Sequence, residues 1–141
     1  MQVSKEKLID ISGELDMQMK CFVHKQTLEL VSFPDELLLD DVDEDAWQEE
    51  VLKIKSHEDD YIEIQRMNST ESFKIMEDFA NSVKDNWVSS RLREALEGKK
   101  PFAHFSHYIH NMPDYHKKAW FSFKQERMAK FIQEQLNFES S

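Results

Sequence analysis

Hydrophobic residues in the first third of the chain recur with a helical period and then give way to strand-like segments. The helical period covers residues 5–17 and predicts a short helix. Its apolar positions are Leu8, Ile11 and Leu15. Residues 21–25 and 28–33 are rich in β-branched and aromatic side chains, which favours two paired strands. Pro34 is expected to end the second strand, because proline has no amide hydrogen to donate to a neighbouring strand.

An acidic stretch separates this expected hairpin from the next elements. Asp43 is the expected N-cap of a helix that runs to about residue 56, because Glu44 and Asp45 would then lie at the positive end of the helix dipole. The apolar positions of this helix are Trp47, Val51 and Ile54. Residues 61–65 then alternate between apolar and polar, which predicts a third strand.

The second half of the chain begins with a strong helix signal. Asn68 and Glu71 have the spacing of a capping box, in which each side chain bonds to the backbone of the other residue. The helix is expected to continue to residue 87, because its apolar residues keep a helical period. These residues are Phe73, Met76, Ala80, Val83 and Trp87.

Three further helices are predicted after this one. A short helix is expected to start at Ser89 or Ser90 and to end at Gly98, because glycine readily takes the positive φ of a helix C-terminus. Proline suits the first turn of a helix, so the next helix is expected from Pro101 to about residue 111. The last is expected from Pro113 to about residue 135.

The predicted order is therefore helix, strand, strand, helix, strand and then four helices. The strands show no βαβ repetition, so we expect a small, mainly antiparallel three-stranded sheet covered by helices. The fold class is α+β with a helical C-terminal half. A chain of 141 residues is expected to form a single domain, with an acidic part over residues 1–70 and a four-helix part over residues 71–141.

Charge is distributed unevenly between these two parts. The formal net charge is -10, but residues 1–70 hold 7 Lys and Arg against 18 Asp and Glu, whereas residues 71–141 hold 11 against 10. Twelve carboxylates lie between Asp35 and Asp60. The acidic character therefore belongs to the first half of the chain.

The composition also predicts where the protein resides. No apolar run exceeds three residues, so a membrane span of about 20 apolar residues is not expected. The opening residues lack the apolar region of a signal peptide. The single cysteine, Cys21, has no partner for an intramolecular disulfide, which agrees with a reducing compartment. We expect a cytoplasmic protein that does not associate with membranes.

Two stretches of the sequence resemble a known family. The first reads Glu-Ser-Phe-Lys-Ile-Met-Glu-Asp-Phe over residues 71–79. The second joins Leu-Arg-Glu-Ala-Leu-Glu-Gly over residues 92–98 to Pro101-Phe102 and to Trp-Phe-Ser-Phe-Lys-Gln-Glu-Arg over residues 120–127. In this order and spacing they resemble the bacterial uncharacterised protein family 0158. The hairpin pattern of residues 22–31 extends the resemblance to nearly the whole chain.

This resemblance implies a fold and a core rather than an activity. Members of the family often have glycine at the position of Leu28, and several carry Arg or Lys around His104 and His107. The family has no established activity, so the resemblance implies no catalytic residue, metal ligand or cofactor.

Histidines are concentrated in the helix predicted from Pro101. Imidazoles three residues apart on a helix can share a metal ion. One hypothesis is therefore a metal-assisted hydrolase that uses His104 and His107, or carboxylates from residues 35–60. The alternative is a solvated helix face, because the histidines lie opposite the apolar face and no HExxH motif is present. We therefore assign no native metal and no cofactor.

The segment from Lys99 to Lys130 is basic and aromatic. It holds seven Lys and Arg against two acidic residues. Basic groups bind phosphates and aromatic rings stack on unpaired bases, so RNA or single-stranded nucleic acid is one expected partner and a protein is the other. Helical spacing assigns the aromatics to two core stripes, one with Trp120, Phe123 and Phe131 and one with Phe121, Met128 and Ile132. The outer face keeps the candidate partner-binding residues His104, His107, Lys117, Lys118 and Lys124.

Arg127 falls on the same stripe as Trp120, so its guanidinium is expected to be partly buried and to need a carboxylate partner. Glu77 borders the apolar face of the helix that starts at Asn68 and is the expected partner, whereas Asp78 is expected to point away. The pair is predicted to be structural.

These observations favour a non-enzymatic binding or regulatory module that acts through its basic C-terminal helices. The chain has no recognisable catalytic motif, which makes an enzyme the less favoured class. The metal-assisted hydrolase remains the alternative hypothesis.

Overall fold

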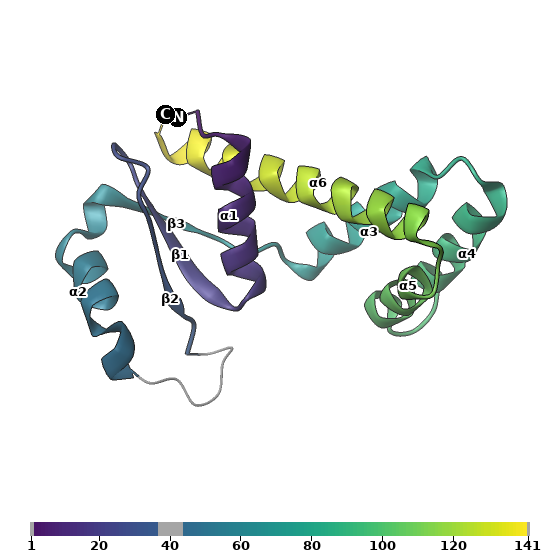
Figure 1. Cartoon of the computed structure of the whole chain (residues 1–141), viewed down its shortest axis with the longest axis horizontal. Helices are drawn as coiled ribbons and strands as arrows, with labels where there is room; N and C mark the ends of the chain where they lie inside the picture. Colours follow the sequence, from purple (N-terminus) through teal and green to yellow (C-terminus); the bar gives the residue numbers. More distant parts are fainter. Residues whose placement is uncertain (1, 37–43, 141) are drawn as a thin grey trace. The chain divides into compact units, whose positions relative to one another are not determined.

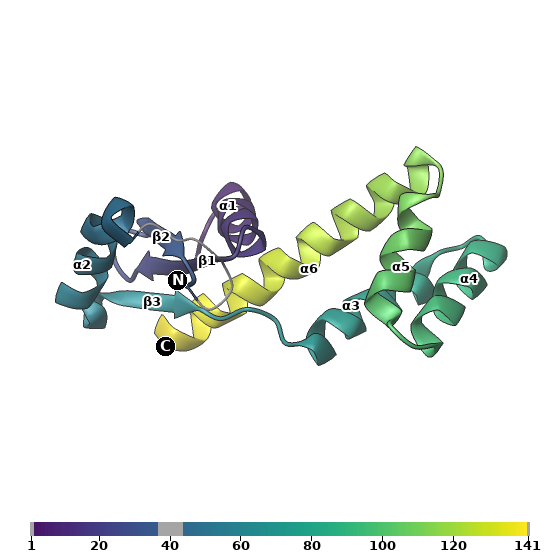
Figure 2. The same cartoon turned by 90° about the horizontal axis from the view of Figure 1, so that it is seen from below.

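The computed structural model describes residues 2–36 and 44–140, and Figures 1 and 2 show it from two directions. The chain divides into two compact units, unit 1 with Met1–Arg66 and Met128–Ser141, and unit 2 with Met67–Arg127. The order of helices and strands and the α+β class are as predicted. The expected boundary at residue 70 assigned the whole last helix to the second part, whereas its second half belongs to unit 1. That the units form a single domain stays a prediction.

Unit 1 is built on a three-stranded antiparallel sheet. Its strands are β1 (Met19–His24), β2 (Leu30–Pro34) and β3 (Tyr61–Ile64), in the order β2-β1-β3. Cys21 at the centre of β1 lies opposite Ser32 of β2 and Ile64 of β3. Side chains alternate between the two faces of each strand, so the sheet presents two faces that helices can cover.

The first face of the sheet packs against α1 (Lys5–Asp16) and the second half of α6 (Asp114–Ser140). Figure 1 shows α1 and α2 on opposite sides of the strands. Ser4 caps α1, its hydroxyl oxygen accepting a hydrogen bond from the amide of Lys7 at 3.2 Å. The predicted apolar residues of α1 are buried against the sheet and α6, in a core that holds Leu8, Ile11, Leu15, Cys21, Val23, Ile62, Ile64, Ile132 and Leu136.

The second face of the sheet is covered more thinly, by the short helices η1 (Glu44–Trp47), α2 (Gln48–Ser56) and η2 (Glu58–Asp60). Only Ile54 of α2 is buried, and it packs with Val31 and Tyr61. Leu52 is 53% exposed. The expected N-cap Asp43 lies outside the described residues. This face therefore buries far less apolar surface than the first.

The β1–β2 turn holds an uncommon backbone conformation. Leu28 has a φ of 63°, in the left-handed region that favours glycine. Its side chain is half-buried and packs against the core on the α1 side of the sheet. The imidazole Nδ1 of His24 accepts hydrogen bonds from the amides of Gln26 and Thr27, both at 3.1 Å. Apolar contact thus offsets backbone strain at Leu28.

Unit 2 is formed by α3 (Ser69–Ser82), α4 (Asn86–Glu97), α5 (Pro101–His110) and the first half of α6. The capping box is present: the Asn68 side chain accepts from the Glu71 amide at 2.8 Å, and the Glu71 side chain accepts from the Asn68 amide at 3.0 Å. Pro101 begins α5 as predicted. The buried core of the unit is formed by Phe79, Ala80, Val88, Leu92, Leu96, Phe105, Ile109 and Met112.

The boundary between α3 and α4 differs from the prediction. The first helix ends at Ser82 rather than at residue 87, because Asp85 caps a new helix by accepting from the amides of Trp87 and Val88. Trp87 is 63% exposed and does not join the core. The other four predicted apolar residues do face the core: Ala80 is buried, and Phe73, Met76 and Val83 pack against it half-buried. Ile75 and Phe79 are buried in addition.

Two expected helix-end residues also have other roles. Ser89 does not cap a helix; its buried hydroxyl donates to the carbonyl of Ala80 at 2.7 Å, in the last turn of α3. Gly98 follows α4 as expected, but its φ is −89°. The left-handed conformation is found at Lys100, with a φ of 53°. The residue with positive φ therefore lies two positions later in the chain than predicted.

The two halves of α6 bury different faces. Trp120 and Phe123 are half-buried against the core of unit 2, whereas Met128 and Ile132 are buried in unit 1. At 3.6 residues per turn, Ile132 is rotated by about 120° from Trp120 around the helix axis. Phe121 was expected in the core and is 61% exposed.

Candidate functional site

The three histidines of α5 do not form a metal site. His104 and His107 are exposed, and the amide nitrogen of Asn111 lies 3.3 Å from the Nε2 of His107. Within residues 2–36 and 44–140, no three His, Cys, Asp or Glu side chains are placed to hold a metal ion together. The structure therefore offers no support for a metal at His104 and His107.

A groove lies between α5 and the first half of α6, inside unit 2. Its volume is about 610 Å³. The lining residues come from both helices and combine basic, hydroxyl and apolar side chains: Ser106, Ile109, His110, Lys117, Lys118, Trp120, Phe121 and Ser122. Two of the candidate partner-binding residues, Lys117 and Lys118, are thus brought together with His110, while His104, His107 and Lys124 are not among the lining residues.

Along α6 two residues of the groove, Lys117 and Phe121, share one stripe with Lys124, which lies one turn beyond the groove lining. Lys117, Phe121 and Lys124 are separated by four and three residues, so they lie within about 60° of one another around the helix. Phe121 is 61% exposed, Lys118 and Lys124 are exposed, and Lys117 is half-buried. An apolar ring is therefore held in solvent with an ammonium group one turn before it and another one turn after it.

The two lysines of this stripe and the neighbouring Lys118 are not neutralised within the described part of the chain. Lys117, Lys118 and Lys124 form no ion pair with a described carboxylate. In contrast, Lys74 and Arg91 pair with carboxylates on their own helices. The positive charge of the groove is therefore available to an external anion.

Trp120 forms the apolar wall of the groove. Its ring contacts Phe79, with ring centroids 5.2 Å apart, and Phe105, with ring centroids 5.0 Å apart at an interplanar angle of 67°. Both of these phenylalanines are buried in the core of unit 2. The indole is consequently held in place by packing, and it gives the groove an aromatic surface beside the ammonium groups of the lysines.

Arg127 lies at the end of unit 2 and is partly buried as expected, but its partner differs from the prediction. Its Nη1 donates to the Oδ2 of Asp78 at 2.8 Å, whereas Glu77 pairs with Lys74. The guanidinium also lies 5.6 Å from the ring centroid of Phe123. The hydrogen bond from Arg127 lowers the pKa of Asp78, and Lys74 at 3.1 Å acts in the same direction. This ion pair joins α3 to α6 within unit 2.

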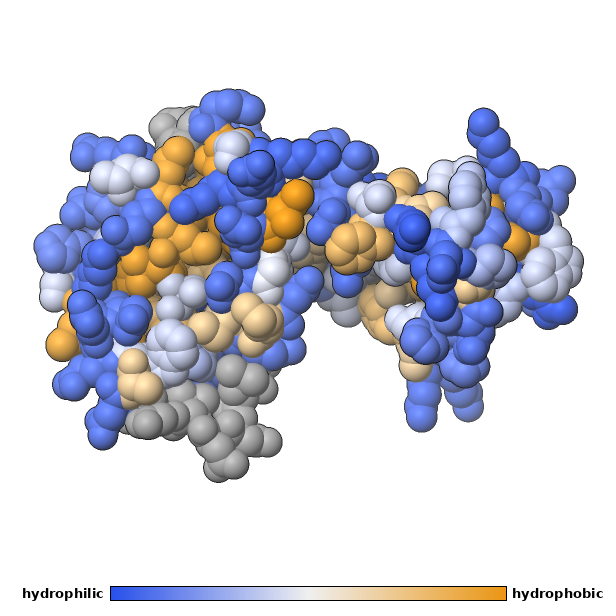
Figure 3. All heavy atoms as spheres, in the orientation of Figure 1, coloured by the Kyte–Doolittle hydropathy of each residue, from blue (hydrophilic) through white to orange (hydrophobic). Residues whose placement is uncertain are grey.

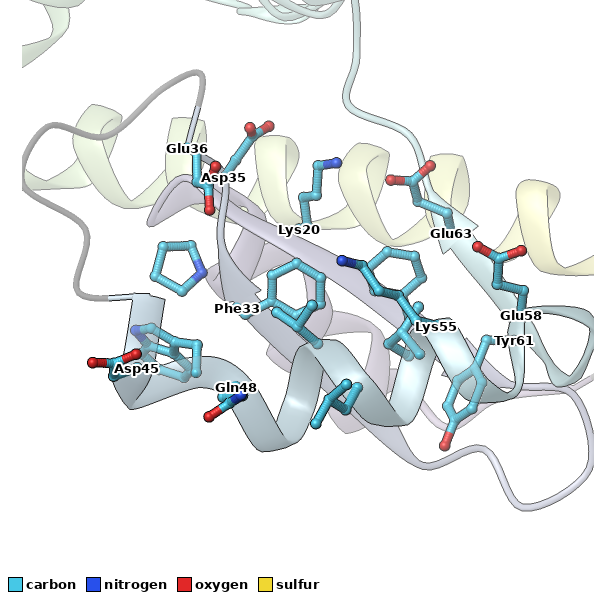
Figure 4. A pocket seen from close by; sticks show the side chains of 16 residues that line it. Lys20, Phe33, Asp35, Glu36, Asp45, Gln48, Lys55, Glu58, Tyr61 and Glu63 are labelled. Atoms are coloured by element: carbon cyan, nitrogen blue, oxygen red, sulfur yellow. The ribbon is translucent and has the colours of Figure 1, made fainter.

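A second opening lies in unit 1, between α2 and the thinly covered face of the sheet. Its volume is about 870 Å³. Figure 4 shows Lys20 and Glu63 on the strands and Lys55 on α2 around this opening, with the ring of Phe33 at its base. In Figure 3 apolar residues gather over the strands of unit 1. The rings of Phe22 and Phe33 stack with centroids 5.5 Å apart.

Acidic residues dominate the rim of this second opening. Five carboxylates line it against two lysines, namely Asp35, Glu36, Asp45, Glu58 and Glu63 against Lys20 and Lys55. Tyr61 contributes its ring, and burial followed by the charge of Glu29 raises the pKa of its phenol. No three of the described carboxylates form a metal-binding group here. The opening thus gives no support to a hydrolase built on residues 35–60.

The charge difference between the units is larger than the sequence halves indicated. Unit 2 carries ten Lys and Arg against eight Asp and Glu, whereas unit 1 carries eight against twenty. The difference grows because the second half of α6, which belongs to unit 1, brings two acidic residues, Glu134 and Glu139, against one basic residue, Lys130. The excess of positive charge is therefore confined to unit 2, and unit 1 carries an excess of negative charge.

Sequence reasoning missed two residues of the groove. His110 was grouped with the other histidines on the outer face of α5, and Phe121 was assigned to the core. The spacing of Phe121 from Lys117 and Lys124 was a usable signal, because residues four and three apart share a helix face. For His110 the sequence contains no such signal, since its place depends on where α6 packs against α5.

The sheet, the helices and the basic groove define a small α+β protein. None of the helices in the described ranges is long and apolar enough to cross a membrane. The model of the Uncharacterised protein family (UPF0158) matches residues 28–140, and the chain belongs to this family. The resemblance inferred from the sequence is thereby confirmed.

A curated relative supports this assignment. The UPF0158 protein PA5073 from Pseudomonas aeruginosa is 28% identical over 68 residues. The match covers 48% of the present chain and 44% of the relative, so it spans less than half of either protein. No solved structure matches the chain.

Proposed function

We propose that the protein is a non-enzymatic, cytoplasmic binding module that takes a negatively charged macromolecule through the groove between α5 and α6. The observation that carries this proposal is the exposed ring of Phe121 between Lys117 and Lys124, which pair with no described carboxylate, with Lys118 beside it. Lysines that stand free in a groove attract anions, and an exposed aromatic ring in the same groove adds apolar contact area.

The distribution of charge supports the choice of an anionic partner. A cationic partner would be drawn to unit 1, with its twelve-charge excess of carboxylates, and not to the lysines of α6. Arg127, Lys74 and Arg91 are already paired with carboxylates, so they contribute less to an external field. Lys117 and Lys118 therefore keep their positive charge in the groove, where an external anion can meet it.

Retention on a column of immobilised heparin, a generic polyanion, tests this proposal. The wild-type protein, despite its net charge of -10, should be retained at low salt and released as salt rises. The double variant Lys117→Gln/Lys118→Gln should elute at a lower salt concentration. Lys84→Gln is the matched control, because Lys84 is exposed in the same unit and lies outside the groove. Identical elution of wild type and double variant, with both folded by circular dichroism, would contradict the proposal.

The metal-assisted hydrolase is not proposed. No observation in the described residues favours it, since His104 and His107 join no group of metal ligands and the carboxylates of the acidic stretch form none.

A further inference from the structure

The partner class can be narrowed further, by an inference that rests on the proposed binding role of the groove. We propose that the anionic partner is single-stranded nucleic acid, with one base stacked on Phe121 and its flanking phosphates held by Lys117, Lys118 and Lys124. Three features of the groove carry this proposal: the orientation of the ring, the spacing of the lysines and the limited charge of unit 2.

The first feature is a ring that projects into solvent. Phe121 is 61% exposed although its neighbours on α6, Trp120 and Phe123, are half-buried in the core. An unpaired base offers a flat face to such a ring, and stacking of this kind needs no enclosing pocket. A peptide side chain is usually anchored by burial in a fitted apolar pocket, which a projecting ring does not supply. The ring is therefore better suited to a base.

The second feature is the position of the ammonium groups on both sides of the ring. Lys117 and Lys124 are seven residues apart, which corresponds to about 10 Å along the helix axis. They therefore reach different phosphates, one on each side of a base stacked on Phe121. Lys118 lies on the groove side of the same turn as Lys117 and adds a third contact. None of the three is paired with a described carboxylate, so a phosphate displaces no existing ion pair.

The third feature excludes a duplex as the preferred ligand. Unit 2 has an excess of only two basic residues, and unit 1 has an excess of twelve acidic ones. A duplex carries one charge for about every 1.7 Å of its axis and stays stiff, so much of its charge would meet no basic residue. A single strand is flexible and can place a few phosphates against the lysines of the groove. Its bases are also free to stack, whereas those of a duplex are already paired.

Fluorescence anisotropy with a labelled oligouridylate of about 12 nucleotides tests the proposal. Three phosphate contacts predict that log K falls with log salt concentration with a slope of about −2. Phe121→Ala should weaken binding by about 5- to 150-fold and leave this slope unchanged, because it removes stacking and no charge. Lys117→Gln/Lys118→Gln should reduce the steepness of the slope by about 1.4.

Matched variants separate stacking from unspecific effects. Phe121→Trp should retain the affinity of the wild type, because indole is also a flat stacking surface. Tyr115→Ala removes another exposed aromatic side chain of α6, 77% exposed and outside the groove, and should leave affinity unchanged. Equal affinities of wild type and Phe121→Ala, or a loss with Tyr115→Ala as large as that with Phe121→Ala, would overturn the assignment of Phe121.

Two competing ligands make the failure of this inference distinguishable from that of the proposed function. A glutamate-rich peptide with one phenylalanine and an RNA duplex of the same length are titrated in parallel. Tighter binding of the peptide or of the duplex than of the oligouridylate would overturn the single-strand assignment and leave the binding role of the groove intact. If the oligouridylate and the peptide both fail to bind, and heparin retention does not depend on Lys117 and Lys118, both proposals fail.

Discussion

The ion pair between Asp78 and Arg127 leads to a prediction that Asp78 contributes more to stability than the neighbouring Glu77. The change is Asp78→Asn, and Glu77→Gln is its matched control on the next residue of α3. Asp78 bonds to Arg127 at 2.8 Å and lies 3.1 Å from Lys74, with 28% of its side chain exposed. Among the described residues Glu77 pairs with Lys74 alone, at 3.5 Å, and both of these side chains are more exposed. Asp78→Asn should therefore cost more stability.

The expected magnitude follows from the burial of the pair. Exposed ion pairs contribute about 0.2–1 kcal/mol, and hydrogen bonds to charged groups about 1.5–3 kcal/mol. A pair with about a third of each side chain exposed falls between these limits, so Asp78→Asn should cost about 1–2 kcal/mol. For a chain of this length that corresponds to a fall in Tm of roughly 3–7 °C. Glu77→Gln should cost about 0.5 kcal/mol or less.

The pH dependence of the difference in unfolding free energy between wild type and Asp78→Asn provides a second test. This difference measures how much the ionised Asp78 stabilises the folded protein. Because Arg127 and Lys74 lower the pKa of Asp78 in the folded protein, the stabilisation is complete above the ordinary carboxyl pKa of about 3.9. It is lost as the pH falls through the lower pKa of the folded state. The gap in unfolding free energy between wild type and Asp78→Asn should stay constant from neutral pH to about pH 5 and shrink below about pH 4.

Urea denaturation at several pH values, followed by circular dichroism, measures these differences. A double-mutant cycle of Asp78→Asn with Arg127→Met should give a coupling of about 1 kcal/mol, whereas a cycle of Glu77→Gln with Arg127→Met should give about zero. Coupling of equal size in the two cycles would refute the assignment of Asp78 as the partner of Arg127. So would a stability gap that persists undiminished at the most acidic pH at which the protein remains folded.

Three further changes test other parts of the fold. Ser89→Ala should cost about 1–3 kcal/mol in chemical denaturation, because it leaves the buried carbonyl of Ala80 without its donor; an unchanged midpoint would show that the bond adds nothing. Leu28→Ala should be less stable than Leu28→Gly by about 1 kcal/mol, since both variants lose the apolar contact and only alanine retains the strain of a positive φ. Burial, followed by the charge of Glu14, raises the pKa of the Cys21 thiol to about 12, so the native protein should react with a thiol reagent at pH 8 far more slowly than the urea-unfolded chain. Comparable reaction rates would place Cys21 outside the core.

Much of the fold could be predicted because the signals are local. The period of Leu8, Ile11 and Leu15, the Asn68–Glu71 capping box and Pro101 at a helix start each act within a few residues. Such signals do not depend on what the segment later packs against. For the same reason the three strands and the helical C-terminal half could be recognised without coordinates.

The groove was predictable only in part. The surplus of lysines near the start of α6 is visible in the sequence, and Lys117 and Lys118 do line the groove. The sequence did not show which other residues line the groove with them. His110 does, whereas His104 and His107 do not. Which face of α5 meets α6 depends on the rotation of two packed helices, and neither helix contains that information alone.

The sequence by itself thus determined the order of the elements, the family resemblance and the concentration of acidic charge in one half of the chain. Only the tertiary structure decided that Asp78 rather than Glu77 meets Arg127, and that Phe121 projects into solvent. The physical reason is that adjacent residues on a helix differ by about 100° in direction. A small error in the assumed buried face therefore assigns an exposed residue to the core, or a buried residue to the surface. In α6 this error was unavoidable from periodicity alone, because the helix buries one face in unit 2 and another in unit 1.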